Sequence, residues 1–472
     1  MSERKKHVMA EHFDQLAPSV DRWKSRNRFY HQDQIDHCRY LVGRGKRVLV
    51  LGSGSGDLLH ALEPSVGVGV DLSPALVDVA ARKYPHLKFI VADAEQLDAL
   101  DDQTFDCIIL SDIVGYLDDV QQCLQGLRRF CHPRTRVIVS YFNFLWQPVL
   151  RLGEKVGLKM PTPEQSWLSL TDLCNLLHLS GFEVVKTDRR MLFPKYVPLL
   201  SWLLNHLGNL PGLNAACLTQ YVVARLWEPG REQALGVSIV VPCRNERGNI
   251  QALVERLPPF GKFQEIIFVD GHSEDGTQAE IRRVASLHPH HNVHLLEQER
   301  TGKGDAVRQG FAAASGDILM ILDADLTVPP EDLPKFHEAV ASGRGEFLNG
   351  CRLIYPMENE AMQTLNLLAN KFFALTFTWL LGQQLKDTLC GTKVLWRDDY
   401  EAIAADRAYF GDFDPFGDFD LLFGASKLNL RIIEIPVRYR RRLYGETKIR
   451  RFRHGLLLLR MVFYAYRKLR SV

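Results

Sequence analysis

The chain has 472 residues, 46% of them hydrophobic, and its formal net charge is +2 at pH 7. This length suffices for two cores of about 200 residues each, and the lack of repeats and low-complexity tracts excludes solenoid and disordered classes. Nine cysteines, an odd number without a Cys-x-x-Cys pair, indicate a reducing compartment and argue against structural zinc.

The first strand predicted in the first half is residues 47–51, an apolar stretch typical of a buried strand. A glycine-rich turn follows, in the order Gly52-Ser-Gly54-Ser-Gly56. Glycines allow positive φ and a close approach of backbone to ligand, although such a turn alone is weak evidence. The next two strands each end in an acid, Asp71 and Asp93.

Together with a strand at residues 105–110, these segments resemble class I S-adenosylmethionine-dependent methyltransferases over residues 35–227. The resemblance implies a Rossmann-like sheet and a set of residues that bind S-adenosylmethionine: Gly52, Gly54, Gly56, Asp71 and Asp93. A nicotinamide-binding domain is the alternative, but it expects Gly-x-Gly-x-x-Gly, and this chain has Gly-x-Gly-x-Gly. The methyl acceptor leaves no readable pattern, because methyl transfer needs mainly alignment of donor and acceptor.

Three other segments of the first half carry weaker predictions. Asp112 and Tyr116, after the fourth strand, either face the cofactor or cap a helix. Residues 191–213, rich in Leu, Trp and Pro, are expected in the core rather than in a lid or membrane-facing cover. Residues 1–34 are expected to be an extension, and no secretory segment is expected because the start of the chain is charged throughout.

After a polar linker at residues 228–236, the second half alternates short apolar strands with helical stretches, as in a doubly wound parallel sheet. Its pattern predicts strands at 237–242, 265–269 and 317–322, and helices at 249–257, 277–287 and 303–314. Each strand ends in a polar turn. Because ligands bind at the carboxyl ends of parallel strands, these turns are expected to line one edge.

The third of these turns holds Asp323-Ala-Asp325, two carboxylates separated by one residue. Side chains alternate along a strand, so positions two apart share a side and can converge on one hard cation such as Mg²⁺ or Mn²⁺. An isolated Asp-x-Asp also arises by chance in surface turns. The setting of this pair, after a buried strand at the ligand edge, predicts a metal and diphosphate site.

Four motifs occur in order in residues 237–454: Val-Val-Pro242-Cys-Arg-Asn-Glu246, Asp270-Gly-His-Ser-Glu-Asp-Gly-Thr, Gly-Lys303-Gly-Asp, and Asp323-Ala-Asp325-Leu-Thr-Val-Pro-Pro-Glu. Together they resemble family 2 glycosyltransferases of the GT-A fold, and among them the polyprenyl-phosphate sugar transferases. The resemblance implies inverting transfer of a sugar from a nucleotide-diphosphate donor. It further implies a nucleotide-binding set, Pro242, Glu246, Asp270 and Lys303, and a catalytic metal held by Asp323 and Asp325.

The acceptor decides which further residues are needed. A hydroxyl acceptor needs a base, for which Asp420 is the candidate; the alternative is a carboxylate that stabilises a helix start. A lipid phosphate is already ionised and needs only cations to position it. Resemblance to the acceptor segments of polyprenyl-phosphate transferases makes Arg442, Lys448 and Lys393 the candidate cations.

The carboxy-terminal end is basic, with 13 Lys or Arg against 2 Asp or Glu in residues 431–472. Its last segment, residues 455–472, is too short and too charged to span a bilayer, which needs ~20 apolar residues. It fits an amphipathic helix on an anionic membrane surface, and docking on its own domain or on a partner subunit is the alternative. No DNA- or RNA-binding module is recognisable, so nucleic acid is not an expected partner.

The sequence therefore predicts an α/β protein with a Rossmann-like methyltransferase domain and a GT-A glycosyltransferase domain. We expect a bifunctional enzyme that uses a nucleotide-sugar donor, a polyprenyl phosphate or other lipid acceptor, S-adenosylmethionine, and Mg²⁺ or Mn²⁺. The alternative is a glycosyltransferase acting on a saccharide or small-molecule hydroxyl, whose first half binds S-adenosylmethionine or serves as a scaffold without turnover. A nucleotidyltransferase fits less well, because residues 240–246 are not a Gly-rich basic loop. The expected location is the cytosol, with peripheral contact at the inner membrane face.

Overall fold

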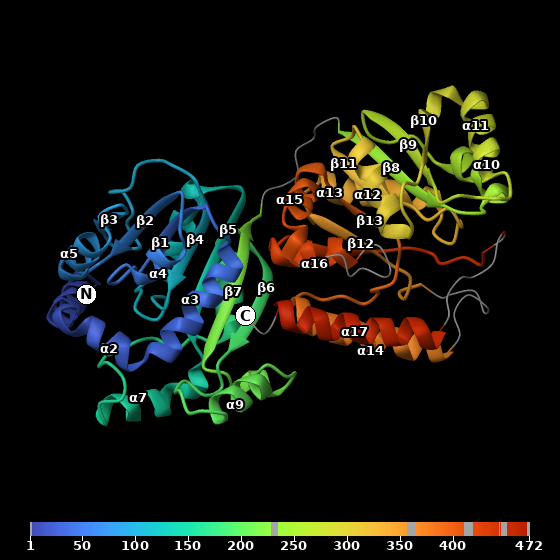
Figure 1. Ribbon diagram of the computed structural model, residues 1–472. Coiled ribbons are helices and arrows are strands. Elements are labelled where there is room, and N and C mark those ends of the chain that lie inside the picture. Colours follow the sequence, from blue (N-terminus) through green and yellow to red (C-terminus); the bar gives the residue numbers. More distant parts are fainter. Residues whose placement is uncertain are drawn as a thin grey trace. The chain divides into compact units, whose positions relative to one another are not determined.

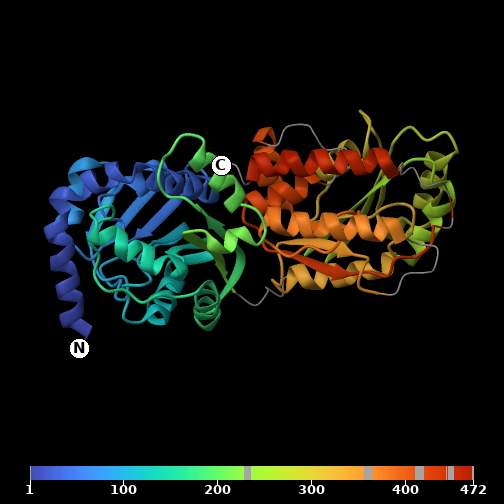
Figure 2. The ribbon, with the colours of Figure 1, turned by 90° about the horizontal axis from the view of Figure 1, so that it is seen from below.

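Each half of the chain folds around a seven-stranded sheet with helices on both faces, as Figures 1 and 2 show. The computed structural model describes residues 2–227, 235–355, 364–409, 419–442, 444 and 451–469. Contacts within the chain separate unit 1, up to Glu228, from unit 2, between Pro229 and Arg470. The two units are described separately.

The sheet of unit 1 has the order β3-β2-β1-β4-β5-β7-β6. The first five strands run parallel, whereas β7 is antiparallel to both β5 and β6. This order departs from the strand order 3-2-1-4-5-6 of dinucleotide-binding folds and so argues against the nicotinamide alternative. The strands are β1 (Arg47–Leu51), β2 (Val66–Asp71), β3 (Lys88–Val91), β4 (Phe105–Ser111), β5 (Cys131–Phe142), β6 (Phe182–Arg190) and β7 (Thr219–Leu226).

The central strand β1 shows why this sequence forms a two-faced sheet. Leu49 and Leu51 join one buried cluster, and Val48 and Val50 join another on the opposite face. All four are fully buried, as expected for a parallel strand covered on both sides. The strand predicted at residues 47–51 is therefore confirmed.

Nine α-helices surround this sheet in the part of unit 1 that the structure describes. Three come before β1, and α1 runs along one edge of the unit (Figure 2). Ser169 and Asp172 form a capping box at the start of α8, which satisfies backbone donors there. The helices are α1 (Ser2–Leu16), α2 (Val20–Arg26), α3 (Arg28–Val42), α4 (Asp57–Ala61), α5 (Pro74–Lys83), α6 (Val120–Gly126), α7 (Gln147–Lys155), α8 (Leu170–Leu179) and α9 (Leu200–Gly208).

The expectation that residues 191–213 lie in the core is wrong for most of their large apolar side chains. Leu199 is 84% exposed and Trp202 is 63% exposed, and both lie at or within α9. Apolar periodicity predicts the helix, but it does not reveal whether another element covers the apolar face.

The sheet of unit 2 has the order β10-β9-β8-β11-β13-β12-β14. All neighbouring pairs are parallel except those of β13, which is antiparallel to β11 and β12. The three strands predicted in this half are confirmed as β8, β9 and β11. The strands are β8 (Gly236–Cys243), β9 (Phe263–Asp270), β10 (Val293–Glu297), β11 (Ile318–Ile321), β12 (Phe347–Cys351), β13 (Lys393–Trp396) and β14 (Ile432–Pro436).

The helices of unit 2 include the three predicted between its first strands, confirmed as α10, α11 and α12. The two long helices α14 and α17 lie side by side (Figure 1), and the rings of Trp379 and Tyr466 stack between them at 5.7 Å. In the described part of the chain, no helix is both long and apolar enough to cross a bilayer. The helices are α10 (Arg247–Arg256), α11 (Thr277–Leu287), α12 (Lys303–Ala313), α13 (Leu333–Ala341), α14 (Thr364–Leu381), α15 (Arg397–Ala405), α16 (Phe419–Lys427) and α17 (Arg451–Leu469).

Candidate functional site

The carboxyl ends of β8, β9 and β11 meet at one edge of the sheet of unit 2. β8 lies between the other two strands and runs parallel to both. Cys243 at the end of β8 lies opposite Asp270 at the end of β9. Leu322, just before Asp323, donates its backbone N–H to Val240 in β8. The prediction that the three polar turns share one edge is therefore confirmed.

Asp323 lies at this edge within a group of cations. Its Oδ1 is 2.6 Å from Nζ of Lys303, the first residue of α12. Burial alone would raise the pKa of Asp323, but the charges of Lys303, Lys393 and Arg352 outweigh it and hold the pKa below its usual value. Asp323 is therefore a carboxylate at neutral pH.

Asp325 is held by the residue two positions further on and by the basic carboxy-terminal stretch. Thr327 donates both its backbone N–H (3.1 Å) and its hydroxyl (2.7 Å) to Asp325 Oδ1. Arg442 donates from Nη2 to Asp325 Oδ2 at 2.7 Å and lies 3.6 Å from Glu246. Arg442 was a candidate for the acceptor phosphate, and the structure places it against the predicted metal ligand.

The residues expected to bind the nucleotide lie at the same edge, but most of them contact protein groups. Asp270 is fully buried and accepts hydrogen bonds from Ser273 (N, 3.0 Å; Oγ, 2.5 Å) and from Gln278 (2.8 Å). Glu246 accepts from Asn249 at 2.7 Å. Pro242 is half-buried next to the end of β8. Their role in nucleotide binding stays a prediction.

Gly391 is a residue of this site whose role the sequence did not reveal. A Cβ atom built on it would lie 2.0 Å from Asp323 Oδ2 and 2.6 Å from Lys303 Nζ. The loop before β13 therefore passes directly over the Asp323–Lys303 pair, and a larger residue at position 391 would force these two side chains to move.

Replacing Gly391 by Ala should displace the Asp323 carboxylate and lower the sugar transfer that the sequence predicts by at least about tenfold, because such overlaps force a shift of the site. Initial rates with nucleotide-sugar donor measure the effect. Gly126→Ala is the matched control, since a Cβ there meets no atom within 4 Å. Equal rates for Gly391→Ala and the control would show that the loop does not shape the site.

Two further residues near Gly391 are buried: Asp387, in the loop before β13, and Lys393, the first residue of β13. Lys393 is 1% exposed and donates from Nζ to the carbonyl of Cys390. Asp387 is fully buried and receives a bidentate pair from Arg352, at 2.7 and 2.8 Å. Asp387 therefore anchors Arg352, and the predicted contact of Lys393 with an acceptor phosphate stays a prediction.

Asp420 lies in the first turn of α16 and is 8% exposed. Arg308 and Arg407 approach its carboxylate to 3.4 and 3.5 Å. Arg308 belongs to α12, the helix that begins with Lys303. Side chains of this one helix therefore contact both Asp323 and Asp420. Lys448 lies outside the described residues.

The acidic pair fits a divalent cation by the chemistry of its donors. Asp323 and Asp325 offer hard carboxylate oxygens, which Mg²⁺ and Mn²⁺ prefer. Among the described residues, no cluster of three or more His, Cys, Asp or Glu is arranged to hold a metal. A cation at this pair would therefore need further ligands, and a diphosphate is a suitable source.

In unit 1, the three predicted glycines all adopt positive φ, between +51° and +80°. A Cβ on Gly52 would lie 2.0 Å from Ile113 Cγ2, and one on Gly56 would lie 2.7 Å from Phe89. Gly54 has open space beside its Cα and lines the cavity of this unit. Gly52 and Gly56 thus allow the tight turn, and Gly54 presents its backbone to the cavity.

The two predicted acids of unit 1 also line the cavity. Asp71 accepts from the backbone N–H of Gly54 at 2.8 Å and of Ser73 at 3.1 Å. Asp93 accepts from Lys6 of α1 at 2.6 Å. Asp71 thus holds the glycine turn in place, and Asp93 connects the end of β3 to an N-terminal helix.

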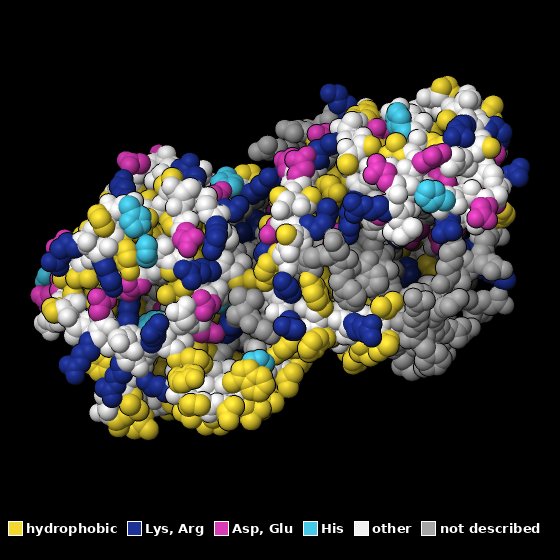
Figure 3. Space-filling model, in the orientation of Figure 1, with side chains coloured by type: hydrophobic (Ala, Val, Ile, Leu, Met, Phe, Trp, Pro, Cys, Tyr) yellow, Lys and Arg dark blue, Asp and Glu magenta, His cyan; other side chains and the backbone are white. Residues whose placement is uncertain are grey.

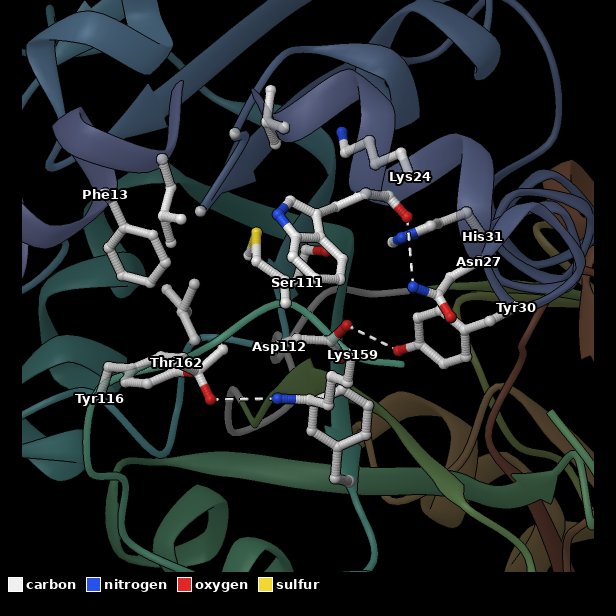
Figure 4. Close-up of a pocket in the computed structure, with 18 of the residues that line it drawn as sticks. Phe13, Lys24, Asn27, Tyr30, His31, Ser111, Asp112, Tyr116, Lys159 and Thr162 are labelled. Carbon is white, nitrogen blue, oxygen red and sulfur yellow. Dashed lines mark hydrogen bonds between the residues drawn. The ribbon is translucent and has the colours of Figure 1, made fainter. Parts of the chain in front are cut away.

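The cavity has a volume of about 770 Å³ and is lined largely by apolar side chains. Helices α1 to α3 close one side of it, so residues expected to be an extension form part of its wall, and Figure 4 shows Phe13, Lys24, Tyr30 and His31 around it. This contribution was not predicted, because those helices carry no recognisable motif.

Asp112 lies in the wall of the cavity with a positive φ of +56°. Its carboxylate accepts from Tyr30 (2.9 Å), Gln34 (2.9 Å) and Ser140 (2.8 Å), and Figure 4 shows the Tyr30 contact. Burial raises the pKa of Asp112. Tyr116 lines the same cavity, so both residues face the predicted cofactor region.

Burial and the nearby charge of Lys24 lower the pKa of His31 to about 4, so its imidazole is neutral at pH 7. Because the unfolded chain binds this proton near pH 6.5, the contribution of neutral His31 to stability is complete above pH 6.5 and is lost as pH falls towards 4. The thermal midpoint of unit 1 should therefore fall over this window, and less steeply in His31→Gln. Calorimetric scans between pH 7.5 and 4 measure both slopes; identical slopes would contradict the assignment.

Comparison with known families gives two matches. Residues 238–403 match the sequence model described as glycosyl transferase family 2, and residues 49–139 match the one described as methyltransferase domain. The first match spans β8 to α15 and includes Asp323 and Asp325. The second spans β1 to β5 and includes the glycine turn, Asp71 and Asp93.

Curated relatives resemble part of the chain. Dolichol-phosphate mannosyltransferase of Pyrococcus furiosus is 28% identical over 221 residues, which cover 45% of this chain and 59% of the relative. Undecaprenyl-phosphate 4-deoxy-4-formamido-L-arabinose transferase of Aeromonas hydrophila is 35% identical over 111 residues, covering 23% of this chain and 34% of the relative. The chain thus spans less than two thirds of the length of these relatives.

Solved structures similar to the chain fall into the same two groups. A methyltransferase from Thermotoga maritima aligns at 20% identity and a TM-score of 0.37, covering 46% of this chain and 99% of its own. Glucosyl-3-phosphoglycerate synthase from Mycobacterium tuberculosis, solved with Mn²⁺ and uridine diphosphate, aligns at 19% identity and a TM-score of 0.37, covering 50% of this chain and 80% of its own.

Proposed function

Because the chain carries a family 2 glycosyltransferase domain and a methyltransferase domain, we propose that it transfers a sugar from a nucleotide-diphosphate donor to a polyprenyl phosphate in unit 2 and a methyl group from S-adenosylmethionine in unit 1. The observation that carries the first activity is the acidic pair Asp323 and Asp325 at the sheet edge, in contact with Lys303 and Arg442. The names of the relatives support the acceptor class.

In the proposed sugar transfer, a phosphate oxygen of the acceptor attacks the anomeric carbon, and the bond from that carbon to the diphosphate breaks with inversion. The nucleoside diphosphate leaves with the electron pair, so negative charge develops on its oxygens. A divalent cation bound at Asp323 and Asp325 would neutralise that charge. Lys303 and Arg442 lie against the same carboxylates and can donate to the diphosphate oxygens.

An acceptor hydroxyl remains the second candidate, because Asp420 could serve as its base. Replacing Asp420 by Asn should leave transfer to polyprenyl phosphate within about threefold, since that acceptor needs no deprotonation. Transfer to a hydroxyl should instead fall by about 10² or more. Rates of Asp420→Asn with both acceptor classes decide between them, and loss of transfer to the phosphate would contradict this proposal.

For methyl transfer, the cavity of unit 1 holds the residues that suit the cofactor. Gly54 presents an open backbone, and Asp71 supplies a carboxylate beside it. The cofactor would supply an activated methyl group on a sulfonium, and the chain must align the acceptor and exclude water. His31, which is neutral at pH 7, belongs to the wall of the same cavity.

The exposed faces of α14 and α17 support peripheral membrane contact of unit 2. Leu375 on α14 is 74% exposed, and Phe463 on α17 is 64% exposed. Arg460 and Arg467 lie beside Phe463 on the surface of α17. Apolar side chains flanked by Arg suit an anionic lipid surface, where a polyprenyl phosphate resides.

One experiment tests the glycosyltransferase proposal directly. The chain is incubated with Mn²⁺, polyprenyl phosphate and a panel of nucleotide sugars, and the products are analysed by mass spectrometry. We expect a glycosylated polyprenyl phosphate and an equal amount of nucleoside diphosphate for one donor. Calorimetry with S-adenosylhomocysteine and a radiolabelled methyl assay test unit 1 separately, and absence of either product rejects the corresponding activity.

A further inference from the structure

Unit 1 carries an apolar surface that no described element of the same unit covers. It consists of the exposed apolar side chains of residues 144–158 and 196–213, and we call it the apolar rim. Figure 3 shows hydrophobic side chains gathered over the end of unit 1 that carries α7 and α9. Monomeric soluble proteins rarely expose large contiguous patches of this kind without an interaction to explain them.

The two helices of the rim, α7 and α9, leave apolar side chains exposed that would ordinarily pack into a core. None of the nine residues of α7 is buried. Leu145, Val149, Leu152 and Val156 follow helical spacing and are each at least 53% exposed. In α9, Trp202 is 63% exposed and Leu203 is 48% exposed. Both helices therefore present an apolar face outward.

The backbone at the start of α9 also holds a leucine outward. Leu199 has a φ of +63° and is 84% exposed. A leucine at positive φ is strained, because its Cβ crowds the neighbouring backbone. In water, no burial of the Leu199 side chain offsets this strain. An apolar medium over the rim would bury the side chain and stabilise this conformation.

The rim is continuous with the cavity that holds the predicted cofactor residues. Val149, Leu152 and Val156 belong to the rim and also line the cavity, and Phe193 and Pro194 line it just before the α9 segment. A molecule with a long apolar part could therefore keep that part on the rim while its polar part enters the cavity.

Charge around the rim favours an anionic surface. Residues 144–160 and 192–216 contain four basic residues, Arg151, Lys155, Lys159 and Lys195, against one acid, Glu154. Glu154 pairs with Lys159, and both Lys159 and Lys195 line the cavity, so Arg151 and Lys155 are the basic residues of these segments that lie outside it. Two copies of the chain meeting through the rim would bring these like charges together, which disfavours self-association.

From these observations we propose that the apolar rim docks unit 1 on the surface of an anionic lipid bilayer. Resting on the proposed methyltransferase activity, we extend this to the substrate class: the methyl acceptor is an amphiphile that stays anchored in the bilayer and offers its polar end to the cavity. The rim thus has the same lipid environment as the acceptor proposed for unit 2.

Hydrogen exchange of the full chain tests the docking without any methyl transfer. Amide exchange is measured by mass spectrometry in buffer, with vesicles of phosphatidylcholine, and with vesicles of phosphatidylcholine and phosphatidylglycerol. With the anionic vesicles, exchange in residues 145–158 and 197–213 should slow by about tenfold or more, because lipid burial stabilises these helices. The readout is local, so protection of α17 does not count towards it.

A matched pair of variants makes this test specific. Trp202→Glu/Leu203→Glu should abolish the protection of the rim, and neither residue lines the cavity. Leu179→Glu/Leu287→Glu adds the same charge at two exposed leucines outside the rim, 54% and 57% exposed, and should retain the protection. Calorimetry with S-adenosylhomocysteine checks that the rim variant keeps its cavity, and it reports on the methyltransferase proposal independently.

Three results would overturn the proposal. In the first, residues 145–158 and 197–213 exchange equally fast with and without anionic vesicles, even if α17 is protected. In the second, the rim is protected without vesicles, increasingly at higher protein concentration, which would identify a second copy of the chain as its occupant. In the third, both double variants lose protection equally, so that added charge alone explains the loss.

Discussion

Replacing Asp323 and Asp325 together by Asn should lower sugar transfer by at least about 10³-fold, because these carboxylates are the groups that would hold the cation on the departing diphosphate. Asn keeps the size of each side chain but removes its charge. The change also removes the ion pairs that Lys303 and Arg442 make with these two carboxylates. Initial rates at saturating donor and acceptor measure the effect.

Asp406→Asn is the control for this prediction, because Asp406 pairs with Lys427 at the surface of the same unit. A surface pair contributes at most about 1 kcal/mol, so the control should keep its rate and its fold. If the double variant transferred sugar at a rate within about threefold of that of the unchanged chain, the acidic pair would have no part in the mechanism.

Replacing Gly52 by Ala should lower the affinity for S-adenosylhomocysteine by at least about 100-fold. The added Cβ would lie 2.0 Å from Ile113 Cγ2 and 3.1 Å from the carbonyl oxygen of Ser111, and the residue has a φ of +73°. The turn must therefore shift, and displacements of about 1 Å in a binding site cost about 10² in function. Calorimetric titration measures the affinity.

A second substitution tests whether the clash between the added Cβ and Ile113 causes the loss of affinity. Ile113→Ala removes the Cγ2 atom, so the double variant Gly52→Ala/Ile113→Ala should recover part of the lost affinity, although the strain of positive φ remains. Ile113→Ala alone gives the reference, because Ile113 lines the cavity itself. If the double variant binds no better than Gly52→Ala, steric overlap with Ile113 does not control the turn.

Local patterns in the sequence predicted the framework of both sites. Apolar strands followed by polar or glycine-rich turns predicted β1, β8, β9 and β11, because burial on both faces requires continuous apolar runs. The order of parallel strands then placed Asp323 and Asp325 at one edge with the turns of β8 and β9. Positive φ at Gly52, Gly54 and Gly56 confirms the tight turn expected there.

Contacts between distant parts of the chain were beyond the reach of these patterns. Arg442 reaches Asp325 across 117 residues, and Gly391 lies over the Asp323–Lys303 pair from a different loop. Neither contact has a local signal, since charge and glycine are common at surfaces for other reasons. The same holds for α1 to α3, whose side chains close the cavity although they carry no motif.

The spacing of apolar residues also could not predict which apolar side chains are exposed. The apolar residues of α9 have the same spacing whether a sheet, a lipid surface or water lies over them. Only the three-dimensional arrangement shows that Leu199 and Trp202 are uncovered and that the adjoining α7 lines the cavity as well.

Titration of Mn²⁺ followed by electron paramagnetic resonance tests the central claim most directly, because it reports cation binding without relying on turnover. With a nucleoside diphosphate present, the unchanged chain should take up Mn²⁺, and the Asp323→Asn/Asp325→Asn variant should leave the ion free at the same concentrations. Equal uptake of Mn²⁺ by the two proteins would contradict the claim that these carboxylates hold the cation at the diphosphate.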